Sequence, residues 1–70
     1  MKALLWRAIG ELPDDAREVY LLRDVEDLSG EEVSKRLGIT IPAMKSRLHR
    51  ARQTVRERLD EKLSASAGQP

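Results

Sequence analysis

The sequence predicts an all-α domain of four helices, the last two of which form a helix-turn-helix without a wing. Two observations lead to this prediction. Glycine and proline divide the chain into segments, and within each segment apolar residues recur at the spacing of an α-helix, with no alternating pattern of the kind that marks a strand. A chain of 70 residues allows one domain, which we place at residues 1–63, with a flexible tail at residues 64–70.

The first two helices are predicted on either side of Pro13. Residues 2–11 form the first, and its apolar side chains at helical spacing are Ala3, Leu5, Trp6 and Ile9. Pro13 with Asp14 and Asp15 is a typical helix start, because proline has no N–H to lose there and carboxylates suit the positive end of the helix dipole. The second helix ends around Glu26–Asp27, and the side chains that it should bury are Ala16, Val19, Tyr20, Leu22 and Val25.

Ser29 and Gly38 bound a short third helix. Ser29 with a glutamate three residues later is a capping box, and Gly38 suits the left-handed C-cap. Thr40 can cap the next helix, and Pro42 falls in its first turn, where a missing N–H costs little. Nothing interrupts that helix before about residue 63. The short helix, the tight turn and the long helix are together typical of a helix-turn-helix.

The last helix has one apolar stripe, which we expect to face the core. Its residues are Met44, Leu48, Ala51, Val55 and Leu59. Val33, Leu37 and Ile39, from the third helix and the turn, should pack against this stripe and fix the angle between the two helices. Ser34 is small where these helices have to cross closely.

Charges are divided unevenly between the two halves of the chain. Residues 1–34 carry four basic and nine acidic side chains, a net charge of −5, and residues 35–70 carry nine basic and three acidic ones, a net charge of +6. No acidic residue lies between Glu32 and Glu57, whereas a solvated helix normally carries glutamates in i,i+4 pairs. The basic stretch therefore favours contacts with the phosphates and base edges of nucleic acid. The alternative is a dipolar helical bundle with solvated charges.

The candidate nucleic-acid contacts lie on the last helix, opposite its apolar stripe. They are Ser46, His49, Arg50 and Gln53 in line with Pro42, Lys45 on one shoulder, Arg47 and Arg52 on the flanks, and Thr40 just before the first turn. Arg47 and Arg52 lie nearer the core and can pair with the acidic half of the chain instead, so we rank them below Lys45 and Arg50. His49 is either a base or phosphate contact or simply an exposed polar residue.

Composition excludes several classes of site. The chain has no cysteine and one histidine, which excludes a disulfide framework and the common zinc sites. A domain this small has little room for a deep catalytic pocket, so we expect neither an enzyme nor a cofactor. The longest apolar run, Ala3–Trp6, is far shorter than a membrane span or a signal peptide requires. We therefore expect a soluble, cytoplasmic protein.

Several segments together resemble a known family. They are Leu12-Pro13, residues 17–29, Glu32-Val33, Leu37-Gly38-Ile39 and Lys45-Ser46-Arg47-Leu48-His49-Arg50-Ala51-Arg52, the last being the most diagnostic. Over about residues 3–63 the chain resembles region 4 of the extracytoplasmic-function (ECF) sigma factors. The resemblance implies a four-helix domain that reads the promoter −35 element in the major groove and docks on the flap of the RNA polymerase β subunit, with an anti-sigma factor as a further partner.

The resemblance also implies roles for single residues. Lys45, Ser46, His49 and Arg50 match the positions that approach bases and adjacent phosphates. The family usually has Gly-Thr-Val before Lys-Ser-Arg, whereas this chain has Pro42-Ala43-Met44. A threonine hydroxyl and one backbone N–H are thus absent at the start of the helix, which predicts a different anchoring there. Because the family's N-terminal, −10-binding domain is missing, we expect an excised domain.

A domain of this family also needs an apolar face for the polymerase. The large apolar side chains that the first two helices offer for it are Leu5, Trp6, Ile9 and Leu22, although an isolated tryptophan such as Trp6 is more often part of the core. Two alternatives stay open. One is a stand-alone helix-turn-helix regulator, which would dimerise through a terminal helix. The other is a sigma mimic that binds an anti-sigma factor and no DNA.

Overall fold

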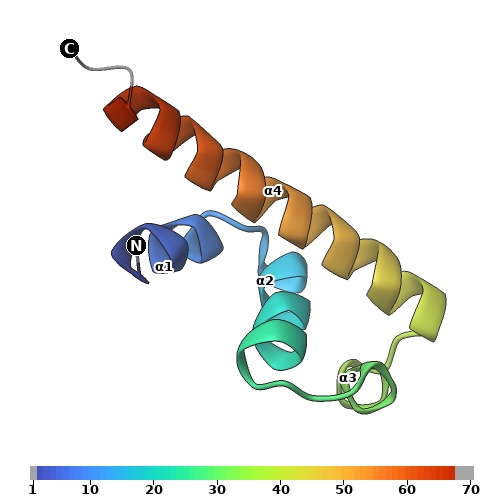
Figure 1. Ribbon diagram of the computed structural model, residues 1–70. Helices are drawn as coiled ribbons and strands as arrows, with labels where there is room; N and C mark the ends of the chain where they lie inside the picture. Colours follow the sequence, from blue (N-terminus) through green and yellow to red (C-terminus); the bar gives the residue numbers. More distant parts are fainter. Residues whose placement is uncertain (1, 68–70) are drawn as a thin grey trace.

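The computed structural model describes residues 2–67, with the side chains of residues 3–62. The elements are α1 (Lys2–Gly10), α2 (Asp14–Tyr20), the π-helical turn η1 (Leu21–Val25), α3 (Gly30–Leu37) and α4 (Ile41–Ala67) (Figure 1). No strand occurs among the described residues, and the predicted all-α fold with four helices is confirmed.

The long helix α4 is the element against which the other helices pack. Helices α1, α2 and α3 all contact it and lie along one side of it, with α1 toward its C-terminal half and α3 at its N-terminal end (Figure 1). The molecule is therefore elongated, 49 × 18 × 17 Å. The helix runs to Ala67, past the end that we expected near residue 63, so residues 64–67 of the predicted flexible tail are helical. The last three residues of that tail lie outside the described residues.

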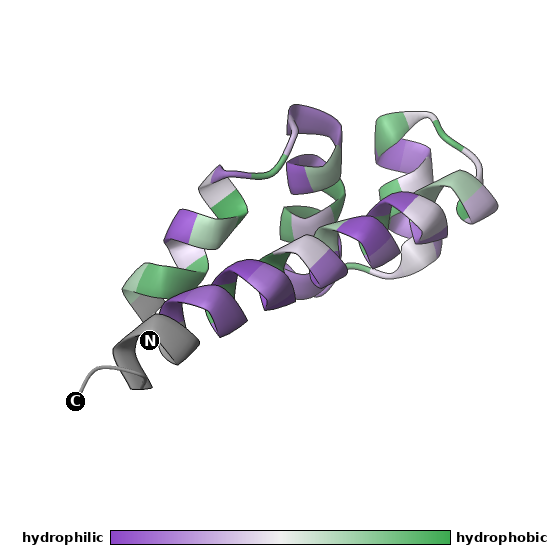
Figure 2. Ribbon diagram, turned by 90° about the horizontal axis from the view of Figure 1, so that it is seen from above, coloured by the Kyte–Doolittle hydropathy of each residue, from purple (hydrophilic) through white to green (hydrophobic). Residues whose placement is uncertain are grey.

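Two apolar clusters between α4 and the shorter helices form the core. The first contains Ala8, Ile9, Leu12, Ala16, Ala51 and Val55. The second contains Val19, Val33, Met44 and Leu48. The predicted apolar stripe of α4 is confirmed, since its first four members are buried and Leu59 is half-buried. Hydrophilic residues follow α4 over much of its length in the view from above (Figure 2).

Two large apolar side chains of the first two helical segments lie outside the core. Trp6 was open between the core and a partner surface, whereas Val25 was expected to be buried. Trp6 is 54% exposed because α1 turns Leu5, Ala8 and Ile9 toward α4, and the tryptophan falls beside that stripe. Val25 is 45% exposed. It lies in η1, where the wider π turn displaces each residue from the position that a continuous α-helix would give it. Tyr20 and Leu22 are half-buried, Ala3 is exposed, and the predicted burial of Ala16 and Val19 is confirmed.

The π turn is a feature that periodicity did not reveal. The N–H of Glu26 donates to the carbonyl of Leu21 at 2.8 Å, and the N–H of Leu28 donates to the carbonyl of Leu22 at 3.0 Å. The chain then reverses through Asp27, a non-glycine residue with φ of 61°. A short aspartate tolerates this left-handed conformation better than a branched residue would. The turn sets the direction from which α3 approaches α4.

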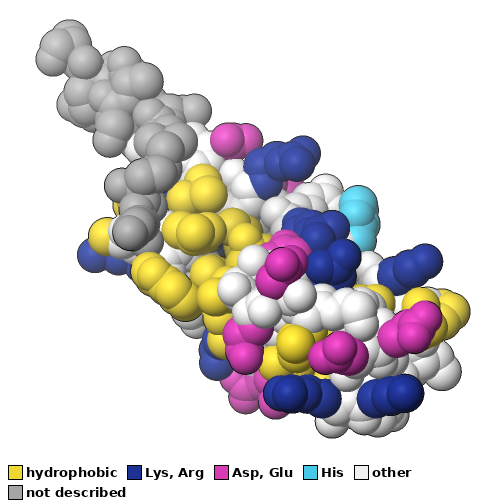
Figure 3. Space-filling view, turned by 60° about the horizontal axis from the view of Figure 1, so that its bottom comes forward, with side chains coloured by type: hydrophobic (Ala, Val, Ile, Leu, Met, Phe, Trp, Pro, Cys, Tyr) yellow, Lys and Arg dark blue, Asp and Glu magenta, His cyan; other side chains and the backbone are white. Residues whose placement is uncertain are grey.

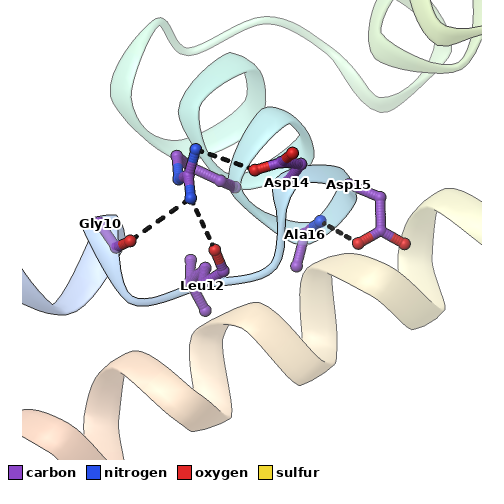
Figure 4. A network of polar contacts seen from close by, with 6 residues as sticks. Gly10, Leu12, Asp14, Asp15 and Ala16 are labelled. Carbon is purple, nitrogen blue, oxygen red and sulfur yellow. Dashed lines mark hydrogen bonds and ion pairs between the residues drawn. The ribbon is translucent and has the colours of Figure 1, made fainter.

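Arg17 connects the end of α1 to the start of α2, and its partners Gly10, Leu12 and Asp14 are labelled in Figure 4. Its Nη2 donates to the carbonyl oxygens of Leu12 at 2.8 Å and Gly10 at 3.4 Å. Its Nη1 lies 3.2 Å from a carboxylate oxygen of Asp14. A guanidinium has enough donors to satisfy these groups together. The connection between the two helices is thereby fixed to the first turn of α2.

Candidate nucleic-acid interface

Caps define the start of α3 and both sides of the turn in the helix-turn-helix. The Oγ of Ser29 accepts the N–H of Glu32 at 3.2 Å at the start of α3. Gly38 ends this helix in the left-handed region, with φ of 65°. The Oγ1 of Thr40 accepts the N–H of Ala43 at 3.2 Å and so caps α4. These three predicted caps are confirmed, and the turn is short because its ends are fixed by local hydrogen bonds.

Packing between α3 and α4 fixes the orientation of the second helix. Val33 is fully buried against Met44 and Leu48, with Leu37 and Ile39 partly buried beside them, as predicted. The contact is close at Gly30, where a Cβ atom would lie 2.8 Å from the Cε of Met44. The exposed face of α4 is consequently held in one direction relative to α3.

That exposed face carries the predicted contact residues. Lys45, Ser46, His49, Arg50 and Gln53 are all exposed on α4. No described acidic side chain lies within ion-pair distance of Lys45 or Arg50. Figure 3 shows basic side chains on the same face as the histidine, which is His49. The face offers cationic groups and hydrogen-bonding groups to a ligand without first breaking an ion pair.

Arg47 and Arg52 are instead paired with the acidic half of the chain. The Nε of Arg47 lies 3.8 Å from the Oδ2 of Asp15 on α2. Arg52 donates from Nε and Nη2 to the two carboxylate oxygens of Asp24, at 2.8 and 2.6 Å. These hydrogen bonds raise the pKa of the Arg52 guanidinium above its ordinary value. The lower rank that we gave these two residues as nucleic-acid contacts is consistent with this pairing.

Two basic residues that sequence reasoning did not select also belong to this surface. Arg23, on η1, lines a hollow together with Lys45, His49 and Arg52. Arg56 lines the next one along α4 with His49 and Gln53. Arg56 could have been found from its spacing of seven residues from His49. Arg23 could not, because its position beside α4 depends on the π turn.

The predicted apolar face is not brought together as expected. Ile9 is only 2% exposed and belongs to the first core cluster, so it is unavailable to a partner. Leu5 packs at the edge of that cluster, whereas Leu22 packs against the second one. Only Trp6 of the four is largely exposed. The reason is that burying α1 against α4 uses the same stripe that we had assigned to the partner.

A different apolar hollow lies between α1, α2 and α4. Leu5, Tyr20, Val55 and Leu59 line it, with charged side chains at its rim. Burial raises the pKa of the Tyr20 hydroxyl, Asp24 raises it further, and Arg52 opposes this change.

The described part of the chain contains no helix with the length and apolar character that a membrane-spanning segment needs.

Comparison with known families agrees with this geometry. A family model described as "Sigma-70, region 4" matches residues 2–55, which include α1, α2, α3 and more than half of α4. The chain belongs to the sigma-70 region 4 family. The matched segment contains Lys45, Ser46, His49, Arg50 and Gln53 and ends one residue before Arg56.

The relatives of this region 4 domain are named as sigma factors. It is 38% identical to the ECF RNA polymerase sigma factor SigE of Mycolicibacterium smegmatis, over 90% of this chain and 24% of the relative. It is 41% identical to the RNA polymerase sigma-E factor of Streptomyces antibioticus, over 84% of this chain and 33% of the relative. The ECF sigma-E factor of Escherichia coli is 31% identical over 79% of this chain and 29% of its own length. The region 4 domain therefore spans a quarter to a third of the length of these relatives.

Proposed function

We propose that this region 4 domain binds promoter DNA during transcription initiation and reads the −35 element as part of an ECF sigma factor. The observation that carries the proposal is the exposed face of α4, where Lys45 and Arg50 project without an acidic partner among the described residues. Family membership supports a role with RNA polymerase, and DNA binding would bring the domain to the nucleoid.

Helix α4 is the recognition helix in this proposal. Helix α4 enters the major groove, which is wide enough to admit an α-helix. Arg50 and Ser46 are the residues best suited to base edges, since arginine can bind guanine through two hydrogen bonds and serine can donate or accept one. Lys45, Arg23 and Arg56 line hollows beside this face and in this proposal hold the phosphates that border the groove.

The second interaction in the proposal is with the RNA polymerase β flap. Trp6 is exposed on α1, and the hollow lined by Leu5, Tyr20 and Leu59 lies next to the same helix. An apolar groove with a charged rim is the kind of surface that accepts an amphipathic helix. The hollow also includes Arg52 and Arg56, which line the hollows beside the exposed face of α4, so in this proposal the polymerase surface adjoins the DNA surface along α4.

Salt-dependent DNA binding tests the first part of the proposal. With about five to seven phosphate contacts, the logarithm of the association constant should fall against the logarithm of the salt concentration with a slope of about −4 to −6. Fluorescence anisotropy with a labelled duplex measures this slope. An affinity for DNA that does not respond to salt would refute the proposal.

Binding to a purified β-flap fragment tests the second part. The substitution Trp6→Glu should abolish flap binding and leave DNA binding unchanged, because Trp6 is largely exposed and contributes little to the core. Leu5→Glu is a poorer choice, since Leu5 packs against the first cluster. Dimeric, tight DNA binding with no flap binding would favour a stand-alone regulator, and binding to an anti-sigma factor without DNA binding would favour a sigma mimic.

A further inference from the structure

The first turn of α4 presents an exposed apolar surface. Ile41 is 41% exposed, Pro42 is exposed, and Ala43 is half-exposed. Pro42 lies one helical turn before Ser46, and Ile41 lies one turn before Lys45, so both are in line with the proposed contact residues. This surface therefore continues the candidate interface to the very start of α4.

The same turn has few backbone donors to offer to a phosphate. Pro42 has no N–H. The N–H of Ala43 is bound to the Oγ1 of Thr40 at 3.2 Å, and the N–H of Met44 is bound to the Thr40 carbonyl at 2.9 Å. A helix start normally attracts anions through these groups. The bond of Met44 is the ordinary first bond of the helix, so the loss concerns Pro42 and Ala43, and of the N–H groups at residues 41–43 only that of Ile41 remains for a phosphate. The Thr40 hydroxyl is occupied as a cap.

The neighbouring charge also disfavours a phosphate at this end of the face. Ile41, Met44 and Lys45 of α4 line a hollow with Ser29, Gly30 and Glu31 at the start of α3. The carboxylate of Glu31 repels a phosphate but has no such effect on an apolar group. The single lysine, Lys45, also lines the neighbouring hollow that contains Arg23 and Arg52. What fits beside Ile41 is therefore an uncharged, apolar part of DNA.

In the major groove, the apolar group on the base edges is the 5-methyl group of thymine. We propose that Ile41 and Pro42 contact thymine methyl groups at one end of the DNA site and thereby select thymine at one or two positions. The inference rests on the proposed DNA-binding function and adds a specificity determinant to it. The remaining residues of the face, Lys45, Ser46 and Arg50, read or hold the adjoining nucleotides.

Replacing thymine by uracil tests the inference on single methyl groups. A preferred duplex is first selected from a random pool with the 70-residue chain, and each thymine in it is then replaced in turn by deoxyuridine. This change preserves base pairing and every hydrogen-bonding group. Loss of one buried methyl group should weaken binding about fourfold at one or two positions at the same end of the site.

Substitutions in the protein then assign the effect to these residues. In Ile41→Ala or Pro42→Ala, the ratio of affinities for the thymine and uracil duplexes should fall to about one at those positions. Trp6→Ala is the matched control, because it removes an exposed apolar side chain from α1, and it should retain the fourfold ratio. The ratio is internal to each variant, so a partly unfolded sample lowers both affinities and leaves it unchanged.

The results separate this inference from the function on which it rests. Sequence-selective binding that is indifferent to every thymine methyl group overturns the inference and leaves the proposed function intact. The inference is also wrong if both variants keep the full methyl effect, because another residue would then make the contact. A chain that binds all duplexes equally refutes sequence reading itself, and the inference with it.

Discussion

Arg52 on α4 and Asp24 on η1 are joined by two parallel hydrogen bonds, from Nε to Oδ2 at 2.8 Å and from Nη2 to Oδ1 at 2.6 Å. The pair links residues 28 positions apart in the sequence. A planar guanidinium matches a carboxylate in this side-by-side arrangement better than a lysine could. It holds a basic side chain of the candidate interface away from a nucleic-acid ligand.

Asp24→Asn should release Arg52 toward DNA. We expect a modest loss in the free energy of unfolding, about 0.2–1 kcal/mol for a partly exposed pair. The affinity for DNA should rise, and the slope against salt should become steeper by about one as Arg52 gains a phosphate contact. Thermal melting and anisotropy titrations at several salt concentrations measure the two effects.

The control for this prediction removes the same charge elsewhere. Asp14 is exposed on α2 and pairs with Arg17, not with α4. Asp14→Asn should leave the salt slope unchanged. The double variant Asp24→Asn with Arg52→Ala should lose the gain in affinity, and persistence of the gain would show that Arg52 is not its cause.

Arg50 and Arg56 should differ in what they contribute. Arg50→Ala should reduce discrimination between −35 sequences by about 1–3 kcal/mol, because a bidentate contact to a base is lost. Arg56→Ala should weaken binding to all sequences about equally or have no effect. Competition between matched and mismatched duplexes measures the discrimination. Unchanged selectivity in Arg50→Ala would mean that another face of α4 enters the groove.

Leu48→Ala should destabilise the domain strongly. Leu48 is 6% exposed in the second cluster, and a truncation of this kind typically costs about 2–5 kcal/mol. In a domain of this size that loss should lower the Tm by about 10 °C or more. Leu48→Met conserves volume and should cost less than about 1.5 kcal/mol. Equal melting temperatures for the alanine variant and the parent chain would contradict the packing of α4.

Tyr20 should make the domain less stable at alkaline pH. Burial and the nearby Asp24 raise the pKa of the Tyr20 hydroxyl above 10.0, and Arg52 only partly opposes this. The folded state therefore favours the neutral phenol. The contribution of neutral Tyr20 to the free energy of unfolding is complete below the unfolded pKa of 10.0 and is lost as the pH rises through the folded pKa. Melting curves from about pH 8 to about pH 11 should show a steeper decline for the parent chain than for Tyr20→Phe. If the melting temperatures of the parent chain and of Tyr20→Phe fell equally with pH, Tyr20 would not be the cause of the alkaline loss of stability.

The sequence was sufficient wherever the deciding interaction is local. The side chains of Ser29 and Thr40 each cap a helix by accepting the backbone N–H of the residue three positions later. Gly38 adopts the left-handed conformation that ends α3. The apolar stripe of α4 was predictable because helical periodicity alone decides which side chains share a face. For the same reason, the exposure of Lys45, Ser46 and Arg50 followed from their positions opposite that stripe.

The tertiary structure alone decided how shared surfaces were divided. Ile9 and Trp6 both looked available in α1, but docking against α4 buried one and exposed the other, because a short helix can turn only one stripe toward its neighbour. The π turn at Leu21–Val25 exposed Val25 and brought Arg23 and Asp24 beside α4. Its i→i+5 hydrogen bonding leaves no periodic signal in the sequence. Whether Arg52 is paired or available was therefore decided by a contact between distant segments.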